Sequence, residues 1–300
     1  MNPITSKPAP AYRRTLTTAD GFPITATVYP AAGALRSNLI VAGATGVPQG
    51  YYRRFAEFAS ARGHETMTLD YRGIGLSAPP TLRGFRMDYM DWARQDLAAA
   101  VDVMAGADVP LLMVGHSYGG HAFGLLPNHR QVAAFYTFAT GAGWHGWMPP
   151  LERAKVWLMW NLIGPLSTRW KGYLPWRSMG MGEDLPLDVY RQWRRWCRFP
   201  RYFFDDPQAR SMLGGFDAVR TPILAANALD DLWAQPRSRD AFMAGYRNTD
   251  WQTLDIDPVA LGVGPIGHMG YFKAQAAPLW ENSLRWLEVN ARSGRAQAAS

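Results

Sequence analysis

Residues 115–120, with the sequence GHSYGG, constrain the fold more than any other stretch of this chain. They follow the apolar run 110–114, which has the length and boundaries of a buried strand, and they precede an apolar segment at 122–126 that suits the start of a helix. A serine at such a junction lies on a sharp turn, and the glycines two residues to either side let strand and helix approach closely. The N-terminus of the helix favours negative charge beside the serine oxygen. The pattern therefore predicts Ser117 as a nucleophile.

Short apolar segments alternate with helical patterns on both sides of this junction. We expect a hairpin over 14–29, and then strands at 38–42, 66–69, 110–114, 132–139, 222–226 and 251–256. Helices are expected from about residue 51, over 91–104 and around 280–287. This alternation predicts an α/β fold with a mostly parallel central sheet flanked by helices.

The alternation is interrupted between residues 143 and 211. This stretch holds eight of the thirteen tryptophans and several methionines, a composition suited to an adaptable apolar wall. We interpret it as a helical lid inserted into a core formed by residues 1–142 and 212–300. Trp193, Trp196 and His145 are the substrate-binding candidates within the lid.

One helix of this insertion, over 188–199, is expected to place apolar residues on one face and four arginines largely on the other. The basic face is either solvated or in contact with anionic substrates or lipid headgroups. Both interpretations remain open from the sequence.

The charge and cysteine content limit the classes of protein to consider. The formal net charge is +7, but the arginines are scattered and no nucleic-acid-binding motif is visible, so we expect no nucleic-acid partner. The single cysteine, Cys197, cannot form an internal disulfide, which favours a reducing cytoplasm.

Residues 1–14 contain no apolar stretch typical of a signal peptide. The most lipid-like stretch, 156–166, is interrupted by polar, Gly and Pro residues and is too short to span a bilayer.

A serine hydroxyl needs a base, and the base needs a carboxylate to orient it. In an open parallel sheet these groups lie at the carboxyl ends of the strands. Of the six histidines, His268 follows the last expected strand on that edge. Asp230 and Asp231 follow the strand at 222–226 on the same edge. Asp231 is the favoured orienting acid and Asp230 is the alternative. Asp255 is the next acid to test.

Taken together, these pieces resemble the α/β-hydrolase superfamily, in its serine-nucleophile, esterase- and lipase-like branch. The matching pieces are GHSYG at 115–119, DYRGIGLS at 70–77, the strand before Asp230-Asp231, and Gly267-His268. The resemblance implies Ser117 as nucleophile, His268 as base and Asp231 as its orienting acid.

The resemblance also implies an oxyanion hole built from the backbone N–H groups of Tyr118 and Ala44, with Thr45 as the alternative to Ala44. Such donors stabilise charge that appears only in the tetrahedral intermediate. Asp70 and Arg72, by contrast, are interpreted as structural residues that tie loops together at the edge of the sheet.

These features predict a serine hydrolase that cleaves a small-molecule carboxylic ester with an apolar acyl or alcohol part. The alternatives are an amidase, a carbon–carbon hydrolase or an acyltransferase that uses the same triad, or a non-catalytic protein that binds a small ligand. No metal or organic cofactor is expected, because the sequence has neither metal-ligand spacing nor a phosphate-binding glycine loop. The sequence does not determine the oligomeric state.

Overall fold

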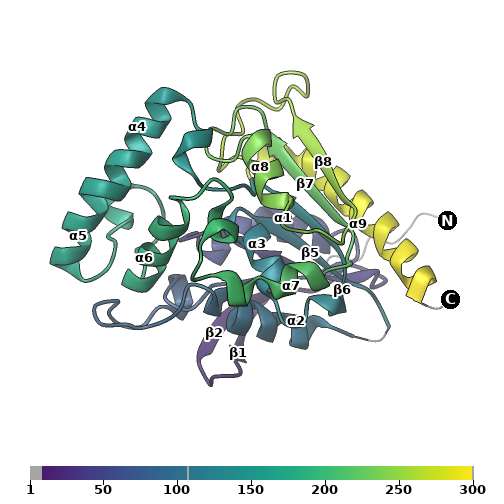
Figure 1. Cartoon of the computed structure of the whole chain (residues 1–300). Helices are drawn as coiled ribbons and strands as arrows, with labels where there is room; N and C mark the ends of the chain where they lie inside the picture. The colour runs from purple at the N-terminus through teal and green to yellow at the C-terminus, as the bar shows by residue number, and fades with distance from the viewer. Residues whose placement is uncertain (1–8, 107, 299–300) are drawn as a thin grey trace.

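The computed structural model describes residues 9–106 and 108–298, and it is built around one eight-stranded sheet (Figure 1). The strand order is β1-β2-β4-β3-β5-β6-β7-β8. The strands are β1 (Tyr12–Thr17), β2 (Pro23–Tyr29), β3 (Ser37–Ala42), β4 (His64–Leu69), β5 (Leu111–His116), β6 (Val132–Phe138), β7 (Ile223–Ala228) and β8 (Trp251–Ile256). β1 and β2 form an antiparallel hairpin that pairs antiparallel with β4, and the remaining pairs are parallel. The predicted α/β fold with a mostly parallel sheet is therefore confirmed.

Helices cover both faces of the sheet. The α-helices of the described residues, on and beside the sheet, are α1 (Arg53–Ser60), α2 (Ala98–Met104), α3 (Tyr118–Ala122), α4 (Pro150–Leu158), α5 (Gly164–Lys171), α6 (Leu187–Trp196), α7 (Gly214–Ala218), α8 (Pro236–Met243) and α9 (Ala277–Ala298). Alternate side chains of β3 enter two separate cores: Leu39 packs in the core with α1 and α9, and Ile40 in the core with α2 and α3. This two-sided burial explains why the central strands are apolar at nearly every position.

The segment between β6 and β7 is much longer than the other connections. It carries α4, α5, α6 and α7, and in Figure 1 α4, α5 and α6 lie beside the sheet rather than on it. A π-helical turn, Met159–Ile163, joins α4 directly to α5. Among the described residues, no helix combines the length and the hydropathy needed to cross a bilayer. The expectation about a signal peptide falls partly on residues 1–8, which lie outside the described residues.

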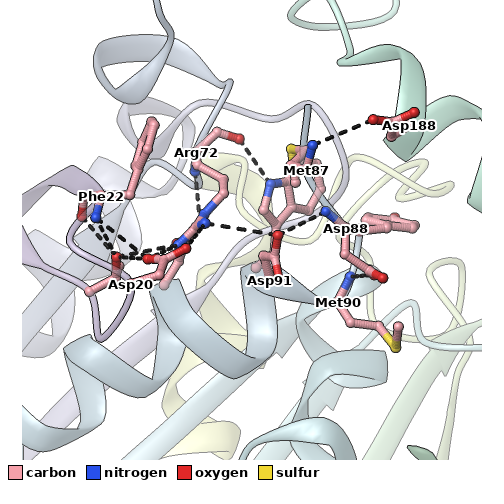
Figure 2. Close-up of polar contacts among 12 residues, drawn as sticks. Asp20, Phe22, Arg72, Met87, Asp88, Met90, Asp91 and Asp188 are labelled. Carbon is pink, nitrogen blue, oxygen red and sulfur yellow. Dashed lines mark hydrogen bonds and ion pairs between the residues drawn. The ribbon is translucent and has the colours of Figure 1, made fainter. Parts of the chain in front are cut away.

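Arg72, in the loop after β4, joins three parts of the chain (Figure 2). Its Nε donates to Asp96 Oδ1 at 2.8 Å and its Nη1 to Asp20 Oδ2 at 2.6 Å. Asp96 is fully buried, whereas Asp20 lies in the exposed turn of the β1–β2 hairpin. The backbone carbonyl of Arg72 also accepts a hydrogen bond from the indole of Trp92. The structural role predicted for Arg72 agrees with this network.

Replacing Arg72 by leucine should lower the free energy of unfolding by about 3–5 kcal/mol, because the change leaves the Asp96 carboxylate buried without its partner. Urea titration followed by circular dichroism measures the loss. The matched control is Arg36→Leu, which removes an exposed pair with Glu288 and should cost less than about 1 kcal/mol. Equal losses in the two variants would contradict this account of the network.

Candidate active site

Ser117 lies at the junction between β5 and α3 with a strained backbone. Its φ is 51° and its ψ is −106°, a conformation that is uncommon for a residue with a side chain. Helix and strands make close contact around it: a Cβ on Gly119 would lie 2.0 Å from the carbonyl oxygen of Ala42, and one on Gly115 would lie 2.8 Å from the backbone of Gly119. Glycine is therefore required at both positions, as the sequence pattern suggested.

The structure brings Ser117, His268 and Asp231 together from three separate loops. The distance from His268 Nε2 to Ser117 Oγ is 3.1 Å, and His268 Nδ1 lies 3.1 and 3.0 Å from the two oxygens of Asp231. Ser117 and His268 both line a cavity, whereas the Asp231 carboxylate is fully buried behind the histidine. This arrangement allows a proton to pass from the hydroxyl to an imidazole held by a carboxylate.

The Asp231 carboxylate is held by several donors. Oδ1 accepts the backbone N–H groups of Trp233 and Ala234, each at 3.0 Å, and Oδ2 accepts the hydroxyl of Tyr271 at 3.2 Å. Burial by itself would raise the pKa of Asp231, but the adjacent His268 and the backbone hydrogen bonds lower it overall. The carboxylate is therefore kept ionised, as is needed to stabilise a protonated histidine.

The other two candidate acids lie elsewhere. The Asp230 carboxylate accepts the backbone N–H groups of Ile266 and Gly267 at 2.8 and 3.0 Å, so it anchors the loop that carries His268. Asp255 forms an ion pair with Arg239 at 2.5 Å, and its side chain is 54% exposed. Of the three, Asp231 is the one that contacts the histidine.

The backbone N–H groups expected to form the oxyanion hole differ in whether they are free to bind a substrate oxygen. Tyr118 is the first residue of α3, so its N–H has no carbonyl partner within the helix. The N–H of Ala44 instead donates to the hydroxyl of Tyr52 at 2.7 Å, so the expectation of a free donor at Ala44 is wrong for this structure. The N–H of Thr45 has no hydrogen-bond partner among the described residues, and Thr45 lines the cavity.

His116, directly before Ser117, links the loops of the site. Its Nε2 lies 3.0 Å from the backbone carbonyl of His268 and its Nδ1 lies 3.0 Å from the hydroxyl of Tyr52. Burial lowers the pKa of His116 to about 3, so the ring is neutral, with the proton on Nε2 facing the carbonyl. Tyr52 then donates to Nδ1 and accepts from Ala44. A single hydrogen-bond chain thus connects the Ala44 loop, His116 and the His268 loop.

The cavity at Ser117 has a volume of about 500 Å³. The described residues that line it include Thr45, Val47, Tyr51, His121, Glu152, Trp176, Met181, Trp193, Trp233 and Met269, together with Ser117 and His268. Most of its wall is therefore aromatic or aliphatic. Its volume suits a small organic ligand.

Only one of the three predicted substrate-binding residues lines this cavity. Trp193 does, and it stacks on Trp176 with ring centroids 5.0 Å apart. Trp196 is a core residue, 3% exposed and stacked on Tyr89, because it lies on the side of α6 that packs against the sheet domain. His145 lies in a turn at His145–Trp147 and is not one of the described residues that line the cavity. The expectations for Trp196 and His145 are corrected accordingly.

Sequence reasoning missed two side chains of the site. The Trp233 ring lies 6.0 Å from that of His268, and its Nε1 donates to Glu152 Oε1 at 2.9 Å. Trp233 could have been found, because it follows the candidate acid Asp231 by two residues on the same turn. Glu152 carried no such signal, since it is one charged residue near the start of a helix. Within the described parts of the chain, no cluster of three or more His, Cys, Asp or Glu side chains is arranged to hold a metal ion.

The comparisons with known proteins identify a family. Residues 39–199, more than half of the chain, match the family model described as "Serine aminopeptidase, S33". A search of curated proteins finds no significant match.

Solved structures with the same fold are distant in sequence. DcsB in complex with its substrate analogue superposes with a TM-score of 0.65 at 17% identity, covering 94% of this chain and all of DcsB. A soluble variant of monoglyceride lipase from Saccharomyces cerevisiae gives a TM-score of 0.65 at 14% identity, covering 97% of this chain and 98% of the lipase. A puromycin-hydrolyzing peptidase from Mycobacterium tuberculosis gives 0.57 at 16% identity, covering 94% of this chain but 39% of the peptidase. These likenesses show the fold.

Replacing Tyr52 by phenylalanine should lower the free energy of unfolding by about 1–3 kcal/mol, since the Ala44 N–H and His116 Nδ1 both lose their buried partner. Thermal and urea unfolding measure the effect. Tyr71→Phe is the matched control: Tyr71 is equally buried, but its hydroxyl makes only a long contact of 3.5 Å to Gly43, so removal should cost less than about 1 kcal/mol. A smaller loss at Tyr52 than at Tyr71 would contradict the proposed hydrogen-bond chain.

Proposed function

Because this chain belongs to the serine aminopeptidase family of the α/β hydrolases, we propose that it is a serine hydrolase acting on a carboxylic ester with an apolar acyl or alcohol part. The observation that carries the proposal is the hydrogen-bonded series Ser117–His268–Asp231 beside a cavity with mostly apolar walls. Family membership and fold support a hydrolase in general. The chemistry of the cavity supports the narrower choice of an ester.

In the proposed mechanism, Ser117 Oγ attacks the ester carbonyl while His268 Nε2 takes the hydroxyl proton. Asp231 stabilises the protonated histidine. The negative oxygen of the tetrahedral intermediate is bound by the backbone N–H groups of Tyr118 and Thr45, and the N-terminus of α3 adds a favourable dipole. His268 then gives its proton to the leaving alcohol, and the acyl group remains on Ser117.

Water completes the cycle by attacking the acyl-enzyme. His268 takes a proton from the water, and collapse of the second intermediate releases the carboxylic acid and restores the Ser117 hydroxyl. Residues 143–211 act as a lid in this proposal, because Trp176 and Trp193 from this segment form part of the cavity wall. The lid limits the access of water and selects the acyl or alcohol part.

Amide hydrolysis is the second candidate, and Glu152 favours it. This is the one acidic side chain among the described residues that line the cavity. A partly buried carboxylate in the cavity wall, such as that of Glu152, could bind a substrate ammonium group. Carbon–carbon cleavage, acyl transfer to another alcohol and simple ligand binding remain alternatives that use the same residues.

The decisive experiment compares three variants on a panel of nitrophenyl esters and anilides of graded chain length. Ser117→Ala and Asp231→Asn should lower kcat/KM by roughly a thousandfold or more, the first by removing the nucleophile and the second by leaving the histidine in the wrong tautomer. Asp230→Asn, the matched control, should lose less than about tenfold, because Asp230 contacts only the backbone of the histidine loop. Unchanged ester turnover in the purified serine variant would contradict the proposal, and faster turnover of anilides than of esters in the wild type would favour the amidase.

Substitutions of the two tryptophans of α6 test whether the lid selects the substrate or only packs against the core. Trp193→Ala should weaken long-chain esters by about 1–3 kcal/mol in transition-state binding and leave acetate esters nearly unchanged. Trp196→Ala should instead lower stability by about 3–5 kcal/mol, as expected for a large core side chain, without a change in chain-length preference. Melting temperatures measured beside the chain-length profiles test both statements, and identical profiles for the two variants would rule out the selective role of Trp193.

A further inference from the structure

Residues 150–171 form one continuous helical segment, from α4 through the π-helical turn to α5, and it is anchored by a single row of side chains. The buried positions are Val156, Trp160, Gly164 and Thr168, each four residues after the last. Residues four apart lie on one face of a helix, so the buried positions of this segment lie on one face. Polar contacts at other positions join the segment to its neighbours: Arg194 donates to the Asn161 side chain, and Arg83 donates to the backbone carbonyl of Trp170.

The face opposite the anchor is apolar as well. Leu158, Leu162, Leu166 and Trp170 also lie four apart, two positions on from the buried row, and their side chains are 41, 50, 61 and 74% exposed. Trp157, at 54% exposed, widens this row. We call these five residues the outer apolar row. Figure 1 places α4 and α5 at the periphery of the molecule, with none of the other drawn elements outside them. Contiguous exposed apolar side chains on this scale are typical of an interaction surface.

Basic residues flank the outer apolar row. Arg153 and Lys155 lie near its start and Arg169 and Lys171 near its end, and the ammonium of Lys171 lies 4.5 Å above the ring of Trp170. Glu152 is the acidic residue of this segment; it contacts Trp233 at the cavity and also Lys155. The segment therefore presents leucine and tryptophan side chains bordered by net positive charge.

We propose that the outer apolar row docks on the surface of an anionic lipid bilayer, with the helix lying in the plane of the interface. Leucine and tryptophan bordered by lysine and arginine is the pattern of helices that lie in this way, because the apolar face enters the acyl boundary and the cations contact the headgroups. A second copy of the chain fits less well. In a two-fold contact between antiparallel copies of this segment, the basic start of one copy would meet the basic end of the other.

The helical segment that carries the docking surface also borders the cavity. Glu152 of α4 lines the cavity, as does Met181, which is 44% exposed. A docked molecule therefore holds this side of the cavity close to the lipid. The proposal does not rest on the function proposed above, because it follows from the exposure and charge of residues that take no part in the chemistry.

Sedimentation with vesicles tests the proposal on the full chain. Wild-type protein should pellet with vesicles of phosphatidylcholine mixed with phosphatidylserine, less with pure phosphatidylcholine, and less with the mixed vesicles at high salt. The double variant Leu162→Glu, Leu166→Glu should lower the partition coefficient by about tenfold or more. The control Val259→Glu, Leu261→Glu adds the same charge at exposed apolar positions after β8 and should change it by less than about threefold.

A second pair of substitutions tests the charged border. Arg169→Gln with Lys171→Gln should weaken binding to the mixed vesicles at low salt and leave the residual binding at high salt unchanged. Melting curves of all variants establish that they are folded, and this pair keeps the proposal testable if the glutamates at 162 and 166 unfold the chain.

Results of three kinds would overturn the proposal. The first is wild-type protein that stays in the supernatant with both kinds of vesicle. The second is equal binding to neutral and mixed vesicles, or equal binding by the double variant and its control. The third is a dimer in sedimentation velocity that the Leu162→Glu, Leu166→Glu variant dissociates, since the surface would then be covered by a second copy.

Discussion

The site depends on the contact between α3 and the strands beneath it. A side chain at Gly119 would collide with the carbonyl of Ala42, so the helix can begin as close to the sheet as it does only with glycine there. This closeness forces Ser117 into a backbone conformation that costs on the order of 1–3 kcal/mol. Hydrogen bonds on either side hold it: the Ser117 N–H donates to Phe138, and the Ser117 carbonyl accepts from Gly120. The serine oxygen is thus positioned by the backbone.

The residue before this serine extends the same constraint to the other loops. His116 is the last residue of β5, and its ring is held between the carbonyl of His268 and the hydroxyl of Tyr52. Tyr51, the neighbour of Tyr52, donates to the carbonyl of Met269. Tyr51, Tyr52 and His116 therefore together hold the loop that carries His268, the proposed base. Movement of this loop would break partly buried hydrogen bonds, which favours its observed position.

Most of the fold and part of the site could be predicted from the sequence. The features that could be predicted depend on strand order, and those that could not be predicted depend on tertiary contacts. The sheet-edge rule selected His268 and the pair Asp230 and Asp231, because it needs only the order of strands, and the structure places Asp231 against the histidine. The donor at Ala44 could not be judged in this way, since its N–H is taken by a tyrosine eight residues later through a bond that no local pattern encodes.

Trp196 shows that helical periodicity has the same limit: it does not tell a core residue from a substrate-binding residue. Trp193 and Trp196 are three residues apart on α6, which separates them by only about 60° around the helix axis. Both therefore belong to the apolar face that the sequence predicts. That face meets two different neighbours, the cavity on the side of Trp193 and the core around Tyr89 on the side of Trp196. Periodicity reports that a side chain is buried, but only the tertiary structure decides whether it meets a ligand or other side chains. α4 and α5 show the converse case. Their apolar stretch is too short to span a bilayer, yet the structure leaves a row of its apolar side chains exposed, because the buried positions of the segment lie on the opposite face.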